Sequence, residues 1–267
     1  MTSSRRESSA LATADDHALA AELATGAGGL LVDLRARLHG DGADPAAMKD
    51  EGDLAAHVWL MDRLDARRPA DAVLSEEGHA DPARLDQERV WIVDPLDGTR
   101  EFGEWPREDW AVHVALVIAG APVCGAVALP ARGVTYSSAA PPSIADEPAA
   151  VPRVAVSRTR MPAVVLELAE RLGAEHVPLG SAGVKTMAVV QGDADVYAHD
   201  GGQYEWDSAA PVAVALAAGL HARRLDGSAL TYNHADPRLP DLVVSHPALA
   251  TQVLAELRAV RDSKPPK

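Results

Sequence analysis

The chain has 267 residues, of which 47% are hydrophobic and 24% are charged, a composition typical of a folded protein with one large domain or two modest ones. Its formal net charge of −14 at pH 7 excludes a broad basic surface for nucleic acid, because neutralising phosphates supplies most of the affinity of such proteins. The single cysteine, Cys124, excludes an intramolecular disulfide and a zinc site built on several thiolates.

The hydropathy pattern gives no sign of a membrane protein. No apolar run approaches the about 18 residues that indicate a spanning helix. The two arginines in the first ten residues are not followed by the apolar segment of a secretory signal. We therefore expect a cytoplasmic protein without a membrane or nucleic-acid partner, and we expect residues 1–10 and 261–267 to be disordered.

The first half of the chain combines helical and strand patterns. Leucines at helical spacing predict helices over residues 15–38 and 53–67. Short apolar runs predict strands over residues 72–74, 90–93, 110–118, 123–129 and 134–137. The third and fourth of these strands form a predicted hairpin, which turns through Gly120, Ala121 and Pro122.

The second half follows a loop rich in proline and alanine at residues 138–152. Strands are predicted over residues 154–157, 176–179, 194–198, 220–223 and 242–244. Helices are predicted over residues 161–172, 183–191, 207–218 and 247–260. Such alternation is typical of an α/β domain. We thus predict an N-terminal α+β domain at 11–137, a linker at 138–152 and a C-terminal α/β domain at 153–260.

The sharpest local feature is the string Val-Asp-Pro-Leu-Asp-Gly-Thr at residues 93–99. Pro95 fixes its own φ and has no N–H, so the preceding strand is expected to end in a β-turn from Asp94 to Asp97. The turn would let these two carboxylates converge on metal ions about 3.5–4 Å apart, with the Leu96 carbonyl as a further ligand. Ligation by oxygen alone favours Mg²⁺ or Mn²⁺. Because Asp-Pro and Asp-Gly are common in turns, the string alone leaves a purely structural turn open.

Further acidic residues lie at comparable places along the chain. Glu76 and Glu77 follow the 72–74 strand, and Asp207 opens the helix predicted at 207–218. Taken separately, the glutamates fit a solvated acidic turn better than a metal site, and Asp207 fits a helix N-cap.

Taken together, the Glu-Glu pair, the string Trp-Ile-Val-Asp-Pro-Leu-Asp-Gly-Thr and the string Trp-Asp-Ser-Ala-Ala resemble the inositol monophosphatase-like, lithium-sensitive, Mg²⁺-dependent phosphatases over roughly residues 15–250. The resemblance implies a mixed α+β and α/β fold, a layered αβαβα sandwich. It implies two or three Mg²⁺ ions, replaceable by Mn²⁺, bound by Glu76, Asp94, the Leu96 carbonyl, Asp97 and Asp207.

The resemblance also implies hydrolysis of a phosphomonoester by metal-activated water, without a covalent phosphoenzyme. The catalytic pair that accepts the proton of the water is then Asp53 and Thr99. Asp53 stands 23 residues before Glu76, which is the usual interval in the family, but the family's threonine before this aspartate is missing here.

Residues 97–102, Asp-Gly-Thr-Arg-Glu-Phe, and the string Gly-Ser-Ala-Gly-Val-Lys at 180–185 resemble the 3′(2′),5′-bisphosphate nucleotidases of the CysQ type. This implies removal of the 3′-phosphate of adenosine 3′,5′-bisphosphate to give AMP, with its sulfated analogue as a second substrate, in sulfate assimilation or nucleotide recycling. A cytoplasmic homodimer is also implied. The implied substrate contacts are Gly98, Thr99, Arg100, Ser157, Arg158, Gly180, Ser181, Lys185 and Asp207. Arg107 and Tyr232 are further candidates, for the second phosphate and for adenine.

Other functions remain open at this stage. Inositol 1-phosphate and fructose 1,6-bisphosphate are alternative substrates within the same fold. A non-catalytic protein that binds divalent metal is an alternative of another class, although Asp94 and Asp97 lack the companion acids of an EF-hand loop.

Overall fold

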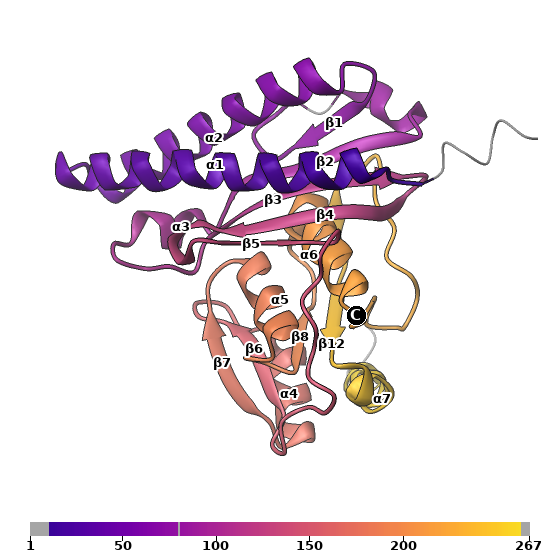
Figure 1. The fold of residues 1–267 in the computed structure, drawn as a ribbon. Helices are drawn as coiled ribbons and strands as arrows, with labels where there is room; N and C mark the ends of the chain where they lie inside the picture. Colours follow the sequence, from indigo (N-terminus) through magenta and orange to yellow (C-terminus); the bar gives the residue numbers. More distant parts are fainter. Residues whose placement is uncertain (1–10, 80, 263–267) are drawn as a thin grey trace, which may run out of the picture.

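The computed structural model describes residues 11–79 and 81–262 (Figure 1). The disorder expected for residues 1–10 lies outside the described residues, as does most of the tail. Arg261 and Asp262 belong to the last helix, so the expectation was wrong for these two residues. Within the described ranges, no helix has both the length and the hydropathy needed to cross a bilayer.

Helices and sheets alternate in five layers (Figure 1). The first layer consists of α1 (Ala14–Gly40) and α2 (Pro45–Arg67). The second is a sheet in the order β1 (Ala72–Ser75), β2 (Arg89–Asp97), β3 (Ala111–Ile118), β4 (Ala121–Leu129) and β5 (Val134–Ser137). The middle layer consists of α5 (Ala182–Gln191) and α6 (Glu205–Ala217).

The fourth layer is a second sheet, in the order β10 (His221–Arg223), β12 (Leu242–Ser245), β8 (Val196–His199), β6 (Arg153–Ser157) and β7 (Glu175–Leu179). Its outer face is covered by α4 (Ala163–Leu172) and α7 (Ala250–Asp262). The arrangement is the predicted αβαβα sandwich, and each helix and strand expected from the sequence is present.

Short elements complete the chain, and the sequence patterns did not predict most of them. They are the 3₁₀ turns Pro82–Asp86, Pro130–Arg132 and Pro247–Leu249, the short helix α3 (Thr99–Gly103) and the strand pair β9 (Gln203–Tyr204) and β11 (Arg238–Leu239). The hairpin between β3 and β4 turns through Ala119 and Gly120, whose φ angles are both positive, one residue earlier than expected.

Helix α2 begins at Pro45, eight residues before the predicted start at residue 53. The Asp44 side chain accepts the N–H groups of Ala46 and Ala47, and proline suits the first turn because its missing N–H has no partner there. Asp53 therefore projects from the middle of a long helix, where its backbone position is rigid.

Three clusters of buried apolar side chains fill the spaces between the layers. The middle cluster contains residues from both sheets. Leu74 of β1, Val184 of α5 and Val244 of β12 belong to this single cluster. Residues 138–152, all of which are described, contain no helix or strand and connect β5 to β6. The predicted division into domains 11–137 and 153–260 stays a prediction, and the shared core packs these two parts against each other.

Candidate active site

The alternation of side chains along β2 aims its last residues at the middle helical layer. Trp91 and Val93 pack in the cluster under α1 and α2, whereas Val90 and Ile92 pack in the cluster that contains α5 and α6. Successive side chains of a strand point to opposite faces. Asp94 therefore follows Val90 and Ile92 toward α5 and α6, and only 1% of it is exposed.

A β-bulge then places a second carboxylate on the same face. Asp94 pairs with His113, and Asp97 pairs with Ala111, so β2 has one residue more than β3 over this interval. The extra residue shifts the alternation, and Asp97 points to the same side as Asp94 although the two are three apart. The predicted β-turn is wrong, because β2 continues through Pro95 to Asp97. Proline is tolerated at such a bulge because no ladder hydrogen bond is required of it.

Asp97 accepts hydrogen bonds at the N-terminus of α5. Its carboxylate oxygens accept the Ser181 hydroxyl, the Ala182 N–H at 3.1 Å and the Gly183 N–H at 2.6 Å. His113 Nε2 lies 3.2 Å from the same carboxylate. Burial alone would raise the pKa of Asp97, but His113 and these donors stabilise the charged form and lower it to about 2. This carboxylate is therefore ionised at neutral pH.

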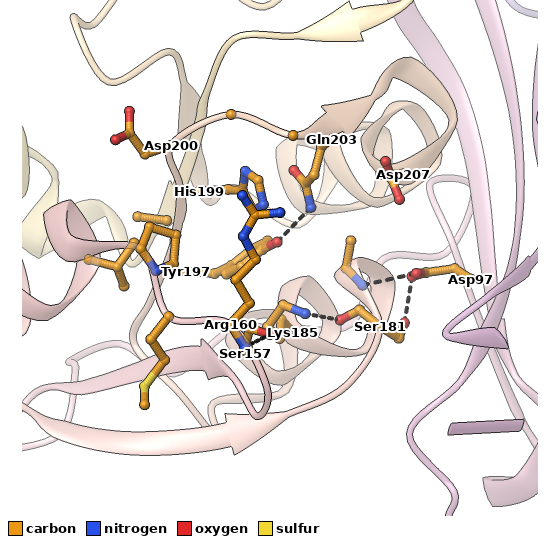
Figure 2. Close-up of a pocket in the computed structure, with 17 residues that line it drawn as sticks. Asp97, Ser157, Arg160, Ser181, Lys185, Tyr197, His199, Asp200, Gln203 and Asp207 are labelled. Carbon is orange, nitrogen blue, oxygen red and sulfur yellow. Dashed lines mark hydrogen bonds between the residues drawn. The ribbon is translucent and has the colours of Figure 1, made fainter. Parts of the chain in front are cut away.

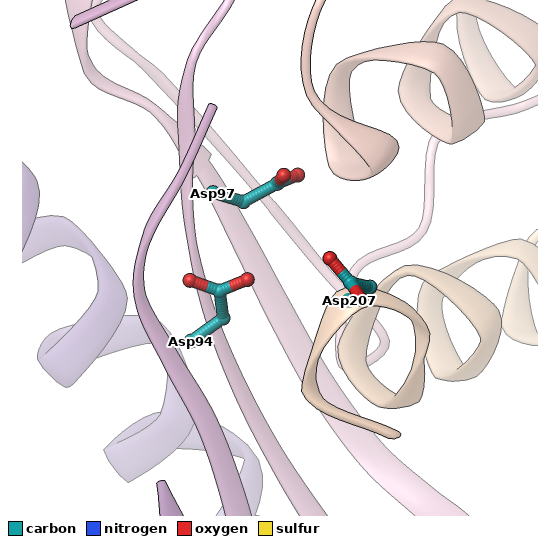
Figure 3. Close-up of side chains that lie close together, drawn as sticks. All are labelled: Asp94, Asp97 and Asp207. Atoms are coloured by element: carbon teal, nitrogen blue, oxygen red, sulfur yellow. The ribbon is translucent and has the colours of Figure 1, made fainter. Parts of the chain in front are cut away.

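Asp207 reaches the other two aspartates from α6. It occupies the third position of that helix, and its Oδ2 accepts the Tyr204 N–H at 2.6 Å. Carboxylate oxygens of Asp94, Asp97 and Asp207 all lie within 4.8 Å of one another (Figure 3). Three acids from β2 and α6, which are far apart in the sequence, thus converge on one point.

Glu76, directly after β1, adds a fourth carboxyl beside Asp94. Burial and repulsion from Glu76, Asp97 and Asp207 hold the pKa of Asp94 well above its usual value. Burial and neighbouring acids likewise raise the pKa values of Glu76 and Asp207 to about 7. These carboxyls cannot all ionise without added positive charge. Hard divalent cations fit this set of oxygen donors best.

Asp53 and Thr99 approach each other beside this cluster. Burial and the nearby Glu77 raise the pKa of Asp53 to about 7, while a hydrogen bond with Thr99 acts in the opposite direction. The Thr99 hydroxyl also lies 3.1 Å from the Leu96 carbonyl, which competes with Asp53 for its single hydrogen. Thr99 is the first residue of α3, after Gly98, whose φ of +88° disfavours any residue with a side chain. The predicted pair is thus adjacent, with Thr99 between Asp53 and the Leu96 carbonyl.

A cavity of about 340 Å³ opens beside Asp97 and Asp207 (Figure 2). Ser157, Ser181 and Lys185, three of the residues expected to contact the substrate, line this cavity. The Lys185 ammonium is buried and donates to the carbonyls of Gly180, at 3.3 Å, and Ser181, at 2.6 Å. The ammonium also lies 5.4 Å from the centre of the Tyr197 ring, and two of its three hydrogens are used by these carbonyls. The volume is within the usual range for small-molecule sites.

Other predicted contacts are already engaged with the protein. Arg158 forms ion pairs with Glu101 at 2.9 Å and Glu104 at 2.7 Å and does not line the cavity. The Gly180 N–H donates to Asp109, which also pairs with Arg107. The N-terminus of α5 binds an anionic group, the Asp97 carboxylate, through the N–H groups of Ala182 and Gly183.

Two further candidates lie away from the cavity. Arg100 is exposed on α3 and does not line it. Tyr232 is buried in the middle core, where its hydroxyl contacts the Ser208 hydroxyl at 3.1 Å. The expected adenine contact by Tyr232 is therefore wrong, because the ring has no open face toward a ligand.

The model of the inositol monophosphatase family matches residues 15–261 of this chain. The chain belongs to the inositol monophosphatase family. The family membership and the fold predicted from the sequence are thereby confirmed.

Proteins similar to this chain are named for different activities. The 3′-phosphoadenosine 5′-phosphate phosphatase of Mycobacterium leprae is 50% identical over 257 residues, which cover 92% of this chain and 94% of that protein. The 3′(2′),5′-bisphosphate nucleotidase CysQ of Escherichia coli is 36% identical over 194 residues, covering 67% and 77%. The crystal structure of inositol monophosphatase II from Staphylococcus aureus superposes with a TM-score of 0.78 at 22% identity, covering 94% and 98%. The last similarity shows the shared fold alone.

Several residues of this inositol monophosphatase family site were not predicted from the sequence. His113 is the one ionisable side chain in the apolar run of β3, and this lone charge in a buried strand was an available signal. Its Nδ1 lies 3.1 Å from the Trp206 carbonyl, so it links β3 to the start of α6. Arg160, His199 and Gln203 line the cavity without any local motif that would have predicted them.

The raised pKa values predict how metal binding depends on pH. In the folded, metal-free protein Glu76 and Asp207 keep their protons up to about pH 7, whereas in the unfolded chain they lose them near pH 4. These groups therefore stabilise the metal-free fold less as the pH rises from about 4 to about 7. Divalent cations compete with the same protons. We expect MgCl₂ to raise the Tm more at pH 8 than at pH 5.5.

The quantity to measure is the difference in Tm with MgCl₂ and with EDTA at each pH. Histidines with shifted pKa values that lie away from the cluster change the Tm of both samples equally. Their effect therefore cancels in the difference. An Mg²⁺-induced shift of equal size at both pH values would contradict the assignment of these carboxyls as the cation site.

Proposed function

We propose that this protein is a divalent-cation-dependent phosphatase that removes the 3′-phosphate of adenosine 3′,5′-bisphosphate, giving AMP and inorganic phosphate. The observation that carries the proposal is the 50% identity, over 92% of the chain, to a 3′-phosphoadenosine 5′-phosphate phosphatase. The site supports it, because the carboxylate cluster adjoins a cavity of about 340 Å³ that contains a buried lysine.

The donor set fits two or three Mg²⁺ ions, with Mn²⁺ as a substitute. Asp94, Asp97 and Asp207 would hold them, since their carboxylate oxygens converge on one point. Glu76, beside Asp94, and the Leu96 carbonyl would complete the set of hard oxygen ligands. Bound ions would lower the pKa of water and offset the charge of the phosphate. They also explain how a chain with a net charge of −14 accepts an anionic substrate.

Asp53 is proposed as the group that takes the proton of the attacking water. A base with a pKa near the operating pH is best matched to this task, and that of Asp53 is about 7 in the metal-free protein. Thr99 orients the water beside Asp53. The oxygen of water forms the new bond to phosphorus, the bond from phosphorus to O3′ breaks, and the released 3′-oxygen acquires a proton.

The rest of the nucleotide is proposed to extend into the cavity. Its reacting phosphate lies at the end lined by Asp97 and Asp207, and Lys185 faces the unreacted phosphate. A charge-assisted hydrogen bond from this ammonium would stabilise a bisphosphate. Inositol 1-phosphate has no second phosphate for this contact.

The test is phosphate release from four esters, with MgCl₂ or with EDTA. They are adenosine 3′,5′-bisphosphate, 3′-phosphoadenosine 5′-phosphosulfate, inositol 1-phosphate and fructose 1,6-bisphosphate. We expect the highest kcat/KM for adenosine 3′,5′-bisphosphate and no turnover in EDTA. A higher kcat/KM for inositol 1-phosphate would overturn the nucleotidase assignment, and no release from any ester would favour a non-catalytic metal-binding protein.

Cytoplasmic location and homodimeric assembly stay predictions. Action on the sulfated analogue is part of the proposal, because this nucleotide carries the same 3′-phosphate.

A further inference from the structure

Arg160, an exposed residue in the connection from β6 to α4, brings a second cation to the edge of the cavity beside the carboxylate cluster. The Arg160 backbone N–H donates to the Ser157 hydroxyl at 3.2 Å, which holds this connection at the rim. The side chain runs into the cavity toward His199 and Gln203 (Figure 2). Its guanidinium approaches Gly202, in the bend before β9. A methyl group added at Gly202 would lie 4.0 Å from the Nη1 atom of Arg160.

Arg160 differs from its neighbour Arg158 in how its charge is balanced. Arg158 is paired with Glu101 and Glu104 on the far side of the connection. Among the described residues, no carboxylate pairs with the Arg160 guanidinium. The five N–H donors of Arg160 are therefore available to a ligand in the cavity.

The charges divide the cavity into two ends. Asp97 and Asp207 line one end, where the cluster would hold cations and the reacting phosphate. Lys185 and Arg160 face the remaining space, with Asp200 as the acid at the exposed rim. His199, which also lines this end, is neutral at pH 7. Burial and the nearby charges of Lys185 and Arg160 lower its pKa to about 4. This end is electropositive and suited to an anion.

We propose that Arg160 binds the unreacted phosphate of a nucleoside bisphosphate and thereby selects substrates with two phosphates over monophosphates. The inference rests on the proposed function, which places the reacting phosphate at the Asp97 end. A planar guanidinium can donate two parallel hydrogen bonds to one phosphate, whereas Lys185 already uses two of its three donors on backbone carbonyls. Arg160 is thus the larger contributor to specificity.

The experiment compares Arg160→Met with the wild type on adenosine 3′,5′-bisphosphate and on adenosine 3′-monophosphate, in MgCl₂. Removing a charge-assisted contact should lower kcat/KM for the bisphosphate by roughly 10–150-fold, mainly through KM. The value for the monophosphate should change little. The kcat/KM of Arg160→Lys for the bisphosphate should lie between those of the wild type and Arg160→Met. Lysine keeps the positive charge but cannot donate two parallel hydrogen bonds.

Calorimetry gives a second readout that needs no turnover. Adenosine 5′-monophosphate carries only the unreacted phosphate, so its affinity should fall in Arg160→Met by a similar factor, while adenosine should bind equally to both proteins. Arg171→Met is the charge control, because Arg171 lies on the surface of α4 and pairs with Glu167 and Glu256. It should alter neither the ratio of kcat/KM values nor the affinity.

An equal loss of kcat/KM on both substrates would overturn the inference and place Arg160 at the reacting phosphate or in the framework. An equal loss of adenosine affinity would assign it to the base. Unchanged binding of adenosine 5′-monophosphate would place it outside the site. Should the wild type fail to hydrolyse the bisphosphate, the proposed function falls, and the calorimetric comparison still decides the inference on Arg160.

Discussion

Asp94→Asn is expected to abolish most of the catalytic activity and at the same time to raise the Tm of the metal-free protein. The Asp94 carboxyl is buried among acids, and burial and their repulsion hold its pKa well above the usual value. A neutral amide removes this repulsion. It also retains the oxygen that accepts the Leu96 N–H at 3.1 Å, so the local backbone is preserved.

The amide is a poor ligand for a hard cation. Altering even the hydrogen-bond partners of metal ligands usually costs 10–100-fold, so the loss of a ligand should lower kcat by more than roughly 100-fold. The measurements are kcat at saturating MgCl₂ and the Tm in EDTA. A wild-type kcat would contradict the metal assignment, and a large fall in Tm would mean that the activity was lost through unfolding.

Asp53→Asn is expected to lower kcat by roughly 10²–10⁴-fold, the usual contribution of a general base. Asp53 projects from α2, outside the three carboxylates that converge within 4.8 Å. Its replacement should therefore change the affinity for Mg²⁺ less than Asp94→Asn does. The measurements are kcat and the Mg²⁺ dissociation constant of each variant by calorimetry.

Asp62→Asn is the matched control for this experiment. Asp62 lies nine residues after Asp53 on the same helix and is exposed, so its substitution removes an equal charge at a distance from the cluster. We expect a kcat close to that of the wild type. If Asp53→Asn and Asp94→Asn weaken Mg²⁺ binding equally, Asp53 is a metal ligand and the role of proton acceptor is wrong.

The sequence by itself determined the layers and the chemistry of the cluster. Strand and helix periods depend on neighbouring residues, so the elements were predictable within a few positions. The acidic residues after β1 and in β2 were candidates because their strings resemble those of a family of metal-dependent phosphatases, and because oxygen ligands favour Mg²⁺ or Mn²⁺. Helix α2 is an exception, since its true start depends on the cap at Asp44, which lies before the leucine pattern.

Tertiary structure alone decided which of these groups meet and which remain free. Asp94 and Asp97 share a face because β2 has one residue more than β3 between them, which forms a bulge. The bulge depends on the register between the two strands, not on the sequence of β2 alone. The partners of Asp97 lie on α5, 85 residues away at Ala182, where no local pattern reveals them.

The same holds for the two arginines of the β6–α4 connection. Arg158 and Arg160 have identical chemistry and nearly identical local sequence positions. Arg158 is neutralised by Glu101, which is 57 residues away, whereas Arg160 reaches the cavity. Ion pairing depends on distances of a few ångströms between groups brought together by folding. For this reason the sequence predicted a phosphate-binding arginine at residue 158, whereas in the folded chain it is the arginine at residue 160 that lines the cavity.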